Sequence, residues 1–345
     1  MTAARNDVAP PDNASGRHTT DVDPTPEREP VTMTPAAMTP AAIASVAIGE
    51  PGRAAAAVTA QPDLAIPFRP DTVLDGVEIR DEAGVPRVVV RAASVRGLSH
   101  RYYGKTRQDE FAFSVAGEGR YLVAAVADGV SAGSLSHIAA DVVTRSGCVR
   151  IARQLRAADP GGLDWTEVLH GLADEVVDRG RRSLRGLRGA EARAVAEHMA
   201  ATALFAVVDL APHDDGAMAV HVMAFGDTSA WLLSPDAPAP WTPLHEVQNA
   251  GAYVASSATF AVPLVPDRAP PPTEARLAPG DALMLMSDGV GDPLGGGTGE
   301  VGTVLAAAWR RPPEPLTFAA QVGFARRSYD DDRTVVAVWP VAGEP

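Results

Sequence analysis

The sequence contains a single cysteine, Cys148, among its 345 residues. One cysteine excludes an internal disulfide and any zinc site that needs several thiolates. Cys148 lies within a helical pattern of apolar residues, so we predict a buried, unreactive thiol rather than a nucleophile.

Long apolar runs and an excess of basic residues are also missing. No apolar segment reaches the roughly 18 residues that a membrane span needs, and Met1 is followed by polar, Pro-rich sequence instead of an export signal. The formal net charge is −13, whereas phosphate backbones and anionic membranes attract clustered Lys and Arg. We therefore expect a cytoplasmic protein with neither a nucleic-acid partner nor a membrane partner.

Aromatic residues are nearly absent from residues 1–68, which are rich in Pro, Ala and Thr and repeat MTPAA at Met33 and Met38. Such a segment buries too little apolar surface to offset the entropy lost on ordering. We predict a disordered tail over residues 1–68 and a folded domain over residues 69–345. Within that domain, the Pro-rich stretch 234–275 indicates a flap or an irregular loop.

The folded part contains groups of strands and groups of helices. Strand patterns cover residues 87–95, 110–115, 121–127, 201–210, 217–225, 229–233, 281–287 and 334–338, and helical spacing covers 134–157, 165–177, 190–200, 299–309 and 316–328. Short turns join the three strands between residues 201 and 233, which predicts an antiparallel meander. The grouping favours an α+β domain built in layers.

Two buried strands end on an Asp-Gly pair. Residues 121–133 read YLVAAVADGVSAG, so a continuous apolar run leads to Asp128-Gly129. Residues 281–292 read DALMLMSDGVGD and repeat the pattern at Asp288-Gly289. A carboxylate at the end of a buried strand is costly unless a cation or hydrogen-bond donors compensate its charge.

Four aspartates occupy comparable positions near strand ends: Asp109, Asp128, Asp288 and Asp331. Oxygen ligands without His or Cys at matching spacing suit Mg²⁺ or Mn²⁺, and the Gly129 carbonyl offers one more oxygen. Converging carboxylates repel one another without a cation, so the set predicts a two-metal site that activates water against a phosphoryl group. Taken singly, each Asp is better explained as a helix cap or turn residue.

Six segments of the chain occur in the order of known family motifs: GLSHRYYGKTRQDEFAF, VADGVSAG, ATALFAVV, FGDTSAWLL, MLMSDGVGD and DDRTVVAV. Together they resemble the metal-dependent serine/threonine protein phosphatases, the PPM or type 2C family. The Gln108-Asp109 pair is similar to a bacterial subgroup with Q-D in its first motif. The resemblance spans residues 93–340 and implies a four-layer α-β-β-α sandwich with two mostly antiparallel sheets.

The resemblance also implies roles at a binuclear Mn²⁺ or Mg²⁺ centre. Asp128 would bridge two ions and the Gly129 carbonyl would complete one of them. Asp109, Asp288 and Asp331 would bind directly or through water, with Asp109, Asp128 and Asp288 as the catalytic carboxylates and Asp292 as a further acidic position. The water between the metals would attack phosphoserine or phosphothreonine in line, without a phosphoenzyme. A phosphoprotein substrate and a cognate Ser/Thr kinase, hence a role in signalling, follow from the same resemblance.

The sequence departs from the family pattern at the phosphate-binding position. The family often carries an arginine five residues before the first-motif Asp, and this chain has Gly104 there. Arginine suits bidentate phosphate binding. Arg107 and Arg101 are the nearest candidates to replace it, although neither matches the position.

Two further motifs differ. Residues 201–203 read ATA where the family has GTT, and counting back from Thr202 places His198 where many members carry an Asp for a third metal. Imidazole is a poorer Mg²⁺ ligand, so a strongly bound third ion is not expected. Asp227 is interpreted as a turn residue rather than a ligand.

Two alternatives compete with the phosphatase hypothesis. Residues 129–133 match G-x-S-x-G, which predicts a serine hydrolase with Ser131 as nucleophile, but the last histidine is His245 and the later Asp motifs would go unused. The second alternative is the same fold serving as a weakly active or inactive binding and regulatory module. The missing arginine favours this module, and the complete carboxylate set disfavours it.

Overall fold

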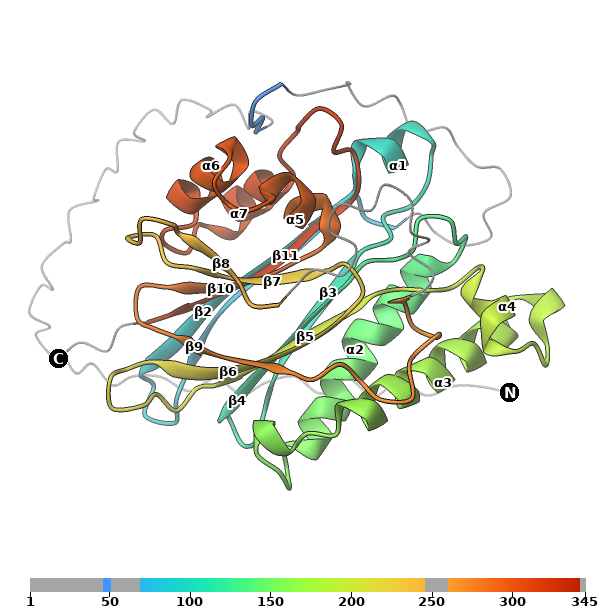
Figure 1. Ribbon diagram of the computed structural model, residues 1–345, viewed down its shortest axis with the longest axis horizontal. Helices are drawn as coiled ribbons and strands as arrows, with labels where there is room; N and C mark the ends of the chain where they lie inside the picture. The colour runs from blue at the N-terminus through green and yellow to red at the C-terminus, as the bar shows by residue number, and fades with distance from the viewer. Residues whose placement is uncertain (1–45, 51–68, 246–259, 342–345) are drawn as a thin grey trace, which may run out of the picture. The chain divides into compact units, whose positions relative to one another are not determined.

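The computed structural model describes residues 46–50, 69–245 and 260–341, all within one compact unit that begins at Ser45. Two antiparallel sheets lie face to face, with helices on the outer side of each (Figure 1). The predicted sandwich of two mostly antiparallel sheets between helical layers is confirmed. None of the described helices is long and apolar enough to cross a membrane.

The first sheet has six strands in the order β1-β2-β11-β10-β7-β8. Their bounds are β1 (Thr72–Arg80), β2 (Pro86–Val95), β11 (Arg333–Pro340), β10 (Ala282–Met286), β7 (Ser229–Leu233) and β8 (Trp241–Pro243). On its outer side lie α5 (Asp288–Leu294), α6 (Glu300–Ala308) and α7 (Pro315–Val322), and the short α1 (Leu98–Tyr102) follows β2 (Figure 1).

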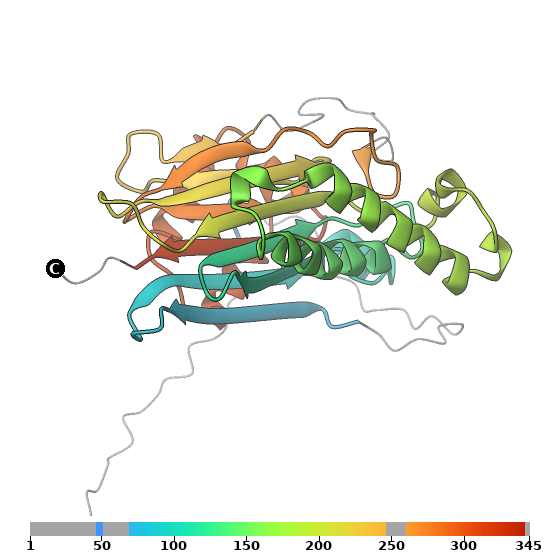
Figure 2. The same ribbon diagram turned by 90° about the horizontal axis from the view of Figure 1, so that it is seen from below.

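The second sheet has five strands in the order β3-β4-β5-β6-β9. Their bounds are β3 (Glu110–Ala116), β4 (Tyr121–Ala127), β5 (Ala203–Asp209), β6 (Met218–Phe225) and β9 (Thr273–Leu277). Figure 2 shows α2 (Ser136–Gln154) and α3 (Trp165–Ser183) lying along its outer side. The 3₁₀ turns Pro160–Gly162 and Arg185–Leu187 and the short α4 (Ala192–Ala196) complete this layer.

The side-chain alternation of β4 divides its residues between two cores. Successive side chains of a strand point to opposite faces. The odd-numbered residues 121–127 pack against α2 and α3, and the even-numbered residues 122–126 pack against the other sheet. Strands β10 and β11 divide in the same way between the inter-sheet core and the core under α6 and α7. This double burial explains why these strands are continuous apolar runs.

The predicted meander over residues 201–233 is wrong. Strands β5 and β6 pair antiparallel, but β7 pairs with β10 and β8 in the other sheet, and β6 takes β9 as its neighbour. The chain crosses between sheets at the turn after β6, where Gly226 has φ 117, a backbone conformation that favours glycine. A short turn between two strands therefore does not by itself show that the two strands pair in one sheet.

The stretch 234–275 is more regular than predicted, because it contains β8 and the start of β9, which are the edge strands of the two sheets. Residues 246–259 of the predicted flap lie outside the described residues. The helix expected over 190–200 is confined to α4.

Residues 46–50, which the sequence assigns to the tail, contact the domain. Ile48 is only 2% exposed in the core under α6 and α7, and its N–H donates to the Ala325 carbonyl over 3.2 Å. Glu50 forms an ion pair of 2.8 Å with Arg327. One apolar side chain and a backbone hydrogen bond therefore hold a segment whose composition alone indicates disorder. Residues 1–45 and 51–68 lie outside the described residues.

Candidate metal centre

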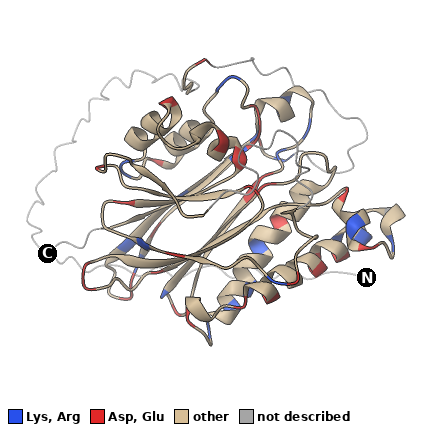
Figure 3. Cartoon of the chain, in the orientation of Figure 1, with Lys and Arg blue, Asp and Glu red and all other residues tan. Residues whose placement is uncertain are grey.

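Four aspartates lie where strands of both sheets begin or end. Asp109 immediately precedes β3 and Asp128 immediately follows β4, and these two strands are antiparallel neighbours. Asp288 begins α5 just after β10, and Asp331 lies just before β11, the antiparallel neighbour of β10. Figure 3 shows acidic segments in red at the start of α5 and at the neighbouring strand ends.

Asp109 is buried, Asp128, Asp288 and Asp331 are partly buried, and the four carboxylates act on one another. Asp109 is 1% exposed, and burial, followed by the charge of Asp332, raises its pKa to about 7. Burial, followed by the charge of Asp288, raises the pKa of Asp128 well above its usual value. Burial and the charge of Asp331 do the same for the pKa of Asp288. Like charges that shift one another's pKa values in this way lie close together.

Two more aspartates extend the cluster. Burial raises the pKa of Asp227, and the charge of Asp227 in turn raises the pKa of both Asp128 and Asp288. Asp227 therefore belongs to the cluster, although the sequence interpretation made it a turn residue. Asp292 lies one helical turn after Asp288 on α5.

The donor set fits divalent cations. Among the described side chains, Asp109, Asp227 and Asp288 each have one buried carboxylate oxygen without a hydrogen-bond donor. A buried, unpaired carboxylate oxygen is costly, and a bound cation would compensate it. Clustered carboxylate oxygens are the ligands that Mg²⁺ and Mn²⁺ prefer.

The glycines of both Asp-Gly pairs allow a close backbone approach. A Cβ at Gly129 would lie 2.8 Å from the carbonyl oxygen of Gln108, which precedes Asp109. A Cβ at Gly289 would lie 1.9 Å from the carbonyl oxygen of Asp332, which follows Asp331. Each Asp-Gly turn is therefore packed against the segment that carries the neighbouring acid.

Thr202 holds the backbone of Asp128 in place. The Asp128 N–H donates to Thr202 Oγ1 over 2.8 Å, and the Thr202 N–H donates to the Asp128 carbonyl over 2.8 Å. The altered motif at residues 201–203 thus retains the one residue whose hydroxyl and amide fix the turn.

Asp332 ties the start of β11 to the segment before Asp109. It is 1% exposed, and its two oxygens accept from the Gly97 N–H at 2.7 Å and the Gln108 N–H at 2.5 Å. His100 Nδ1 lies 2.9 Å from the Asp332 carboxylate. Burial opposes the charge of His100, but the hydrogen bond to Asp332 and the charge of that carboxylate raise its pKa above the usual value.

His100 is a residue that the sequence analysis did not place in the site. Its ligand atoms lie within 4.8 Å of those of Asp331 and Asp332, so the three form a potential metal-binding group. Both oxygens of Asp332 already accept backbone hydrogen bonds. We therefore assign His100 and Asp332 to the support of the centre, which leaves Asp331 to face the other carboxylates.

Arg107 does not fit the phosphate-binding role proposed from the sequence. Its side chain is 1% exposed, donates to Ser94 Oγ over 2.5 Å and lies 3.2 Å from the Glu110 carboxylate. It braces the start of β3 from inside the domain. Arg101, the other candidate, pairs with the Asp71 carboxylate at 3.3 Å.

Neither Ser131 nor Cys148 has the surroundings of a nucleophile. The exposed Ser131 hydroxyl has no hydrogen bond to a histidine within the described part of the chain, and the last histidine, His245, is directed to the Thr228 carbonyl at 3.2 Å. Burial raises the pKa of Cys148 to about 12. The prediction of a buried thiol is confirmed, and the serine hydrolase alternative lacks a base for Ser131.

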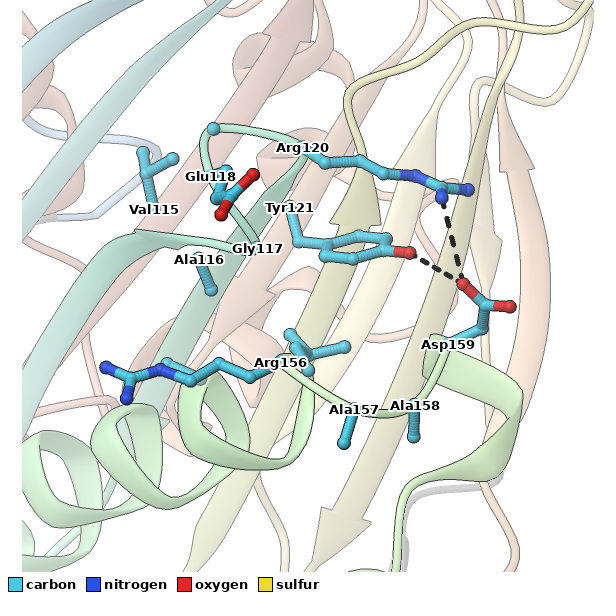
Figure 4. Close-up of a pocket in the computed structure, with 13 residues that line it drawn as sticks. Val115, Ala116, Gly117, Glu118, Arg120, Tyr121, Arg156, Ala157, Ala158 and Asp159 are labelled. Atoms are coloured by element: carbon cyan, nitrogen blue, oxygen red, sulfur yellow. Dashed lines mark hydrogen bonds and ion pairs between the residues drawn. The ribbon is translucent and has the colours of Figure 1, made fainter.

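A separate pocket of about 830 Å³ lies at the opposite end of β4 (Figure 4). It is lined by residues 115–121 of the β3–β4 hairpin, by Ala152 in α2 and by residues 155–159 after that helix. Tyr121 donates to the Asp159 carboxylate there over 2.9 Å. None of the clustered aspartates lines this pocket, so the candidate chemistry lies at the strand ends instead.

Comparison with known families assigns the chain. A sequence model described as Protein phosphatase 2C matches residues 96–323. The chain belongs to the protein phosphatase 2C family. The match includes Asp109, Asp128, Asp288 and Asp292 but ends before Asp331, so the position of Asp331 in the cluster comes from the structure. A search of curated proteins gave no match.

Solved structures of phosphatases resemble this protein phosphatase 2C family member at low identity. A phosphatase from Toxoplasma gondii has a TM-score of 0.51 and 13% identity over 78% of this chain and 97% of that one, which shows a common fold. The PPM Ser-Thr phosphatase MsPP from Mycobacterium smegmatis has 19% identity over 72% and 97% of the two chains, with a TM-score of 0.44. The catalytic domain of the serine threonine phosphatase PstP, in complex with two manganese ions, has 18% identity over 74% and 99%, with a TM-score of 0.44.

Proposed function

We propose that this protein phosphatase 2C family member hydrolyses phosphoserine and phosphothreonine on proteins with two Mn²⁺ or Mg²⁺ ions. The observation that carries the proposal is that carboxylates from separate segments raise one another's pKa, while Asp109, Asp227 and Asp288 each keep a buried oxygen without a hydrogen-bond donor. The proposed ligands are the carboxylates of Asp109, Asp128, Asp227, Asp288 and Asp331 and the Gly129 carbonyl, with Asp292 as an outer acid.

Asp128 is the best candidate for a carboxylate shared between two ions. The charges of four other aspartates, Asp288, Asp109, Asp227 and Asp331, all act to raise its pKa. When bound, the ions would neutralise these carboxylates, polarise a phosphoryl oxygen and lower the pKa of a water molecule. The turn that holds Asp128 is fixed by Thr202, so the carboxylate keeps its position before substrate arrives.

No third ion is part of the proposal. His198 is exposed, and its carbonyl accepts a hydrogen bond of 2.8 Å from the Leu135 N–H. No pKa shift within the carboxylate cluster has His198 among its causes. A cytoplasmic location, a cognate kinase and membership of the Q-D subgroup stay predictions.

The test is hydrolysis of p-nitrophenyl phosphate by the full chain with Mn²⁺, with EDTA, and after Asp128→Asn. We expect turnover that requires the metal and falls at least about 100-fold in the variant, because a ligand is lost. Asp174→Asn, which changes an exposed acid on α3, is the matched control and should keep full activity. Turnover that is unaffected by EDTA and by Asp128→Asn would contradict the proposal.

The second candidate function is a binding or regulatory module with the phosphatase fold. It is favoured by Gly104 at the usual arginine position and by the burial of Arg107. Calorimetry with Mn²⁺ and the turnover assay together separate the two functions, because both proteins would bind the metal but the module would show no turnover.

A further inference from the structure

Lys105 is the only lysine in the chain, and the other 29 of its 30 basic residues are arginines. The two side chains are not interchangeable, because lysine carries a compact ammonium on a flexible stem whereas arginine presents a rigid planar fork. Because all the remaining basic positions are arginines, Lys105 carries the only side-chain ammonium of the chain. The contacts of Lys105 therefore indicate the role of that ammonium.

The backbone of Lys105 is anchored while its side chain is exposed. The residue lies between α1 and β3, in the segment that leads to Asp109. Its N–H donates to the His100 carbonyl over 2.8 Å, and its carbonyl accepts from Arg96 Nη1 at 3.1 Å. Two hydrogen bonds to buried residues therefore fix the position from which the exposed side chain extends.

The Lys105 ammonium reaches the first Asp-Gly turn. Its Nζ donates to the Ser131 carbonyl over 3.2 Å, and Ser131 follows Asp128 by three residues in that turn. The contact crosses from the segment that carries Asp109 to the segment that carries Asp128. The ammonium is thus held against the exposed part of the turn that follows Asp128.

Neighbouring basic side chains are already engaged with acids. Arg96 and Arg101 both pair with Asp71, and Arg107 pairs with Glu110. Each arginine within residues 96–109 forms an ion pair with a carboxylate, whereas the Lys105 ammonium donates to the neutral Ser131 carbonyl. Its positive charge is therefore available to an anion.

We propose that Lys105 binds the phosphoryl group of the substrate at the metal centre, an inference that rests on the proposed function. An ammonium has three N–H donors, and the Ser131 carbonyl accepts from one of them. The remaining donors suit the oxygens of a phosphate monoester. Because the side chain is exposed, it is open to a phosphate carried on a protein surface.

The first test measures the kinetics of Lys105→Met and Lys105→Arg on a phosphoserine peptide with Mn²⁺. A charge-assisted hydrogen bond to phosphate predicts that Lys105→Met raises KM about tenfold or more, with a smaller effect on kcat. Lys105→Arg should recover most of the loss, because it restores a cation. The matched control is Arg153→Met, at an exposed position near the end of α2, which should leave KM unchanged.

The second test does not depend on turnover. Because Lys105 is the only side-chain amine, an amine-acylating reagent labels it and the chain's amino terminus alone. We expect inorganic phosphate to protect Lys105 from acylation in the Mn²⁺-loaded protein, as measured by mass spectrometry of the peptide that contains it. Lys105→Arg reports the background from the amino terminus.

The outcomes separate this inference from the proposed function. Metal-dependent turnover with unchanged KM in Lys105→Met and no phosphate protection would overturn the role of Lys105 and leave the phosphatase proposal intact. Protection of Lys105 without any turnover would support its role in phosphate binding and contradict the catalytic proposal. Neither turnover nor protection would overturn both.

Discussion

The two Asp-Gly turns of the candidate metal centre are built from the same parts in different sheets. Each follows a strand that is buried on both faces, β4 for Asp128-Gly129 and β10 for Asp288-Gly289. Each is fixed by a hydroxyl that accepts a backbone hydrogen bond: Thr202 Oγ1 from the Asp128 N–H, and Ser287 Oγ from the Thr334 N–H at 2.9 Å. Both sheets therefore place an aspartate at a strand end with the same combination of an apolar strand, a glycine and a hydroxyl.

The two turns lead into different local structures. After Asp288 the chain enters α5 at once, with Ser287 as the N-cap residue. After Asp128, residues 129–135 form a turn before α2 begins, and this turn carries the exposed Ser131 and the contact from Lys105. The Asp288-Gly289 turn is closed by packing, whereas the turn after Asp128 is open to solvent. We infer that both turns hold ligands and that the first also faces the substrate.

The largest expected difference between the turns is in catalysis. Asp128→Asn and Asp288→Asn should each lower metal-dependent hydrolysis at least about 100-fold. The larger loss is expected for Asp128, because the charges of four other aspartates of the cluster act on its carboxylate. Calorimetry should show that Asp128→Asn weakens both bound Mn²⁺ ions and that Asp288→Asn mainly weakens one. Equal losses in rate and in metal stoichiometry would mean that the turns are equivalent.

The pH dependence of stability compares the acids beside each turn. In the metal-free protein the pKa of Asp109 is raised from 3.8 to about 7, so the folded state holds a proton that the unfolded state releases. Stability is then present at low pH and lost as pH rises towards about 7. For Asp331, burial raises the pKa and the His100 charge partly opposes that rise.

We therefore expect the metal-free protein to unfold at higher urea concentration near about pH 5 than near about pH 8. Asp109→Asn should flatten this dependence more than Asp331→Asn does, because the amide mimics the protonated acid. Mn²⁺ should reverse the trend, since the ion binds deprotonated carboxylates. Metal-free stability that increases with pH over this range would contradict the assignment.

The glycines provide a test of how tightly each turn is packed. Gly289→Ala places a Cβ 1.9 Å from a backbone oxygen, and Gly129→Ala places one 2.8 Å away. Overpacking predicts a loss of about 3 kcal/mol in unfolding free energy for Gly289→Ala and about 1–2 kcal/mol for Gly129→Ala. Urea unfolding measures both. Gly186→Ala is the control, because no atom lies within 4 Å of its added Cβ.

The smallest effects concern the hydroxyls. Thr202→Val and Ser287→Ala each leave a buried backbone N–H without its acceptor, which should cost about 1–2 kcal/mol of unfolding free energy. Thr202→Ser keeps the hydroxyl and serves as the control in the same unfolding measurement. Thr202→Val should also lower activity, because it loosens Asp128, and Ser287→Ala should lower it less. Identical behaviour of Thr202→Val and Thr202→Ser would remove the role given to this hydrogen bond.

The sequence predicts the central strands and the Asp-Gly turns, because both depend on local patterns. A strand buried on both faces must be apolar throughout, and β4 and β10 are easily recognised for that reason. The layered fold and the positions of Asp109, Asp128, Asp288 and Asp331 near strand ends follow from the same patterns. Edge strands such as β1 and β9 have exposed faces and give weaker signals.

The remaining features depend on pairing between distant segments. Nothing local in residues 226–233 indicates that β7 joins the other sheet, and this crossing brings Asp227 into the cluster. Arg107 is near Asp109 in sequence, but its side chain points into the core toward Ser94 and Glu110. Composition singles out Lys105 as the only lysine. The role proposed for it depends on the contact with Ser131, which the sequence does not reveal.

The double burial of β4 also determines where the chain tolerates insertions and deletions. A shift of one residue along the strand would exchange every side chain between the helix-facing core and the inter-sheet core. Tyr121 would then move from beside α2 into the space between the sheets, and Leu122 would move the other way. Changes of length should therefore be confined to the hairpin residues 117–120, far from Asp128. A single deletion inside β4 would disrupt both cores and displace Asp128 at the same time.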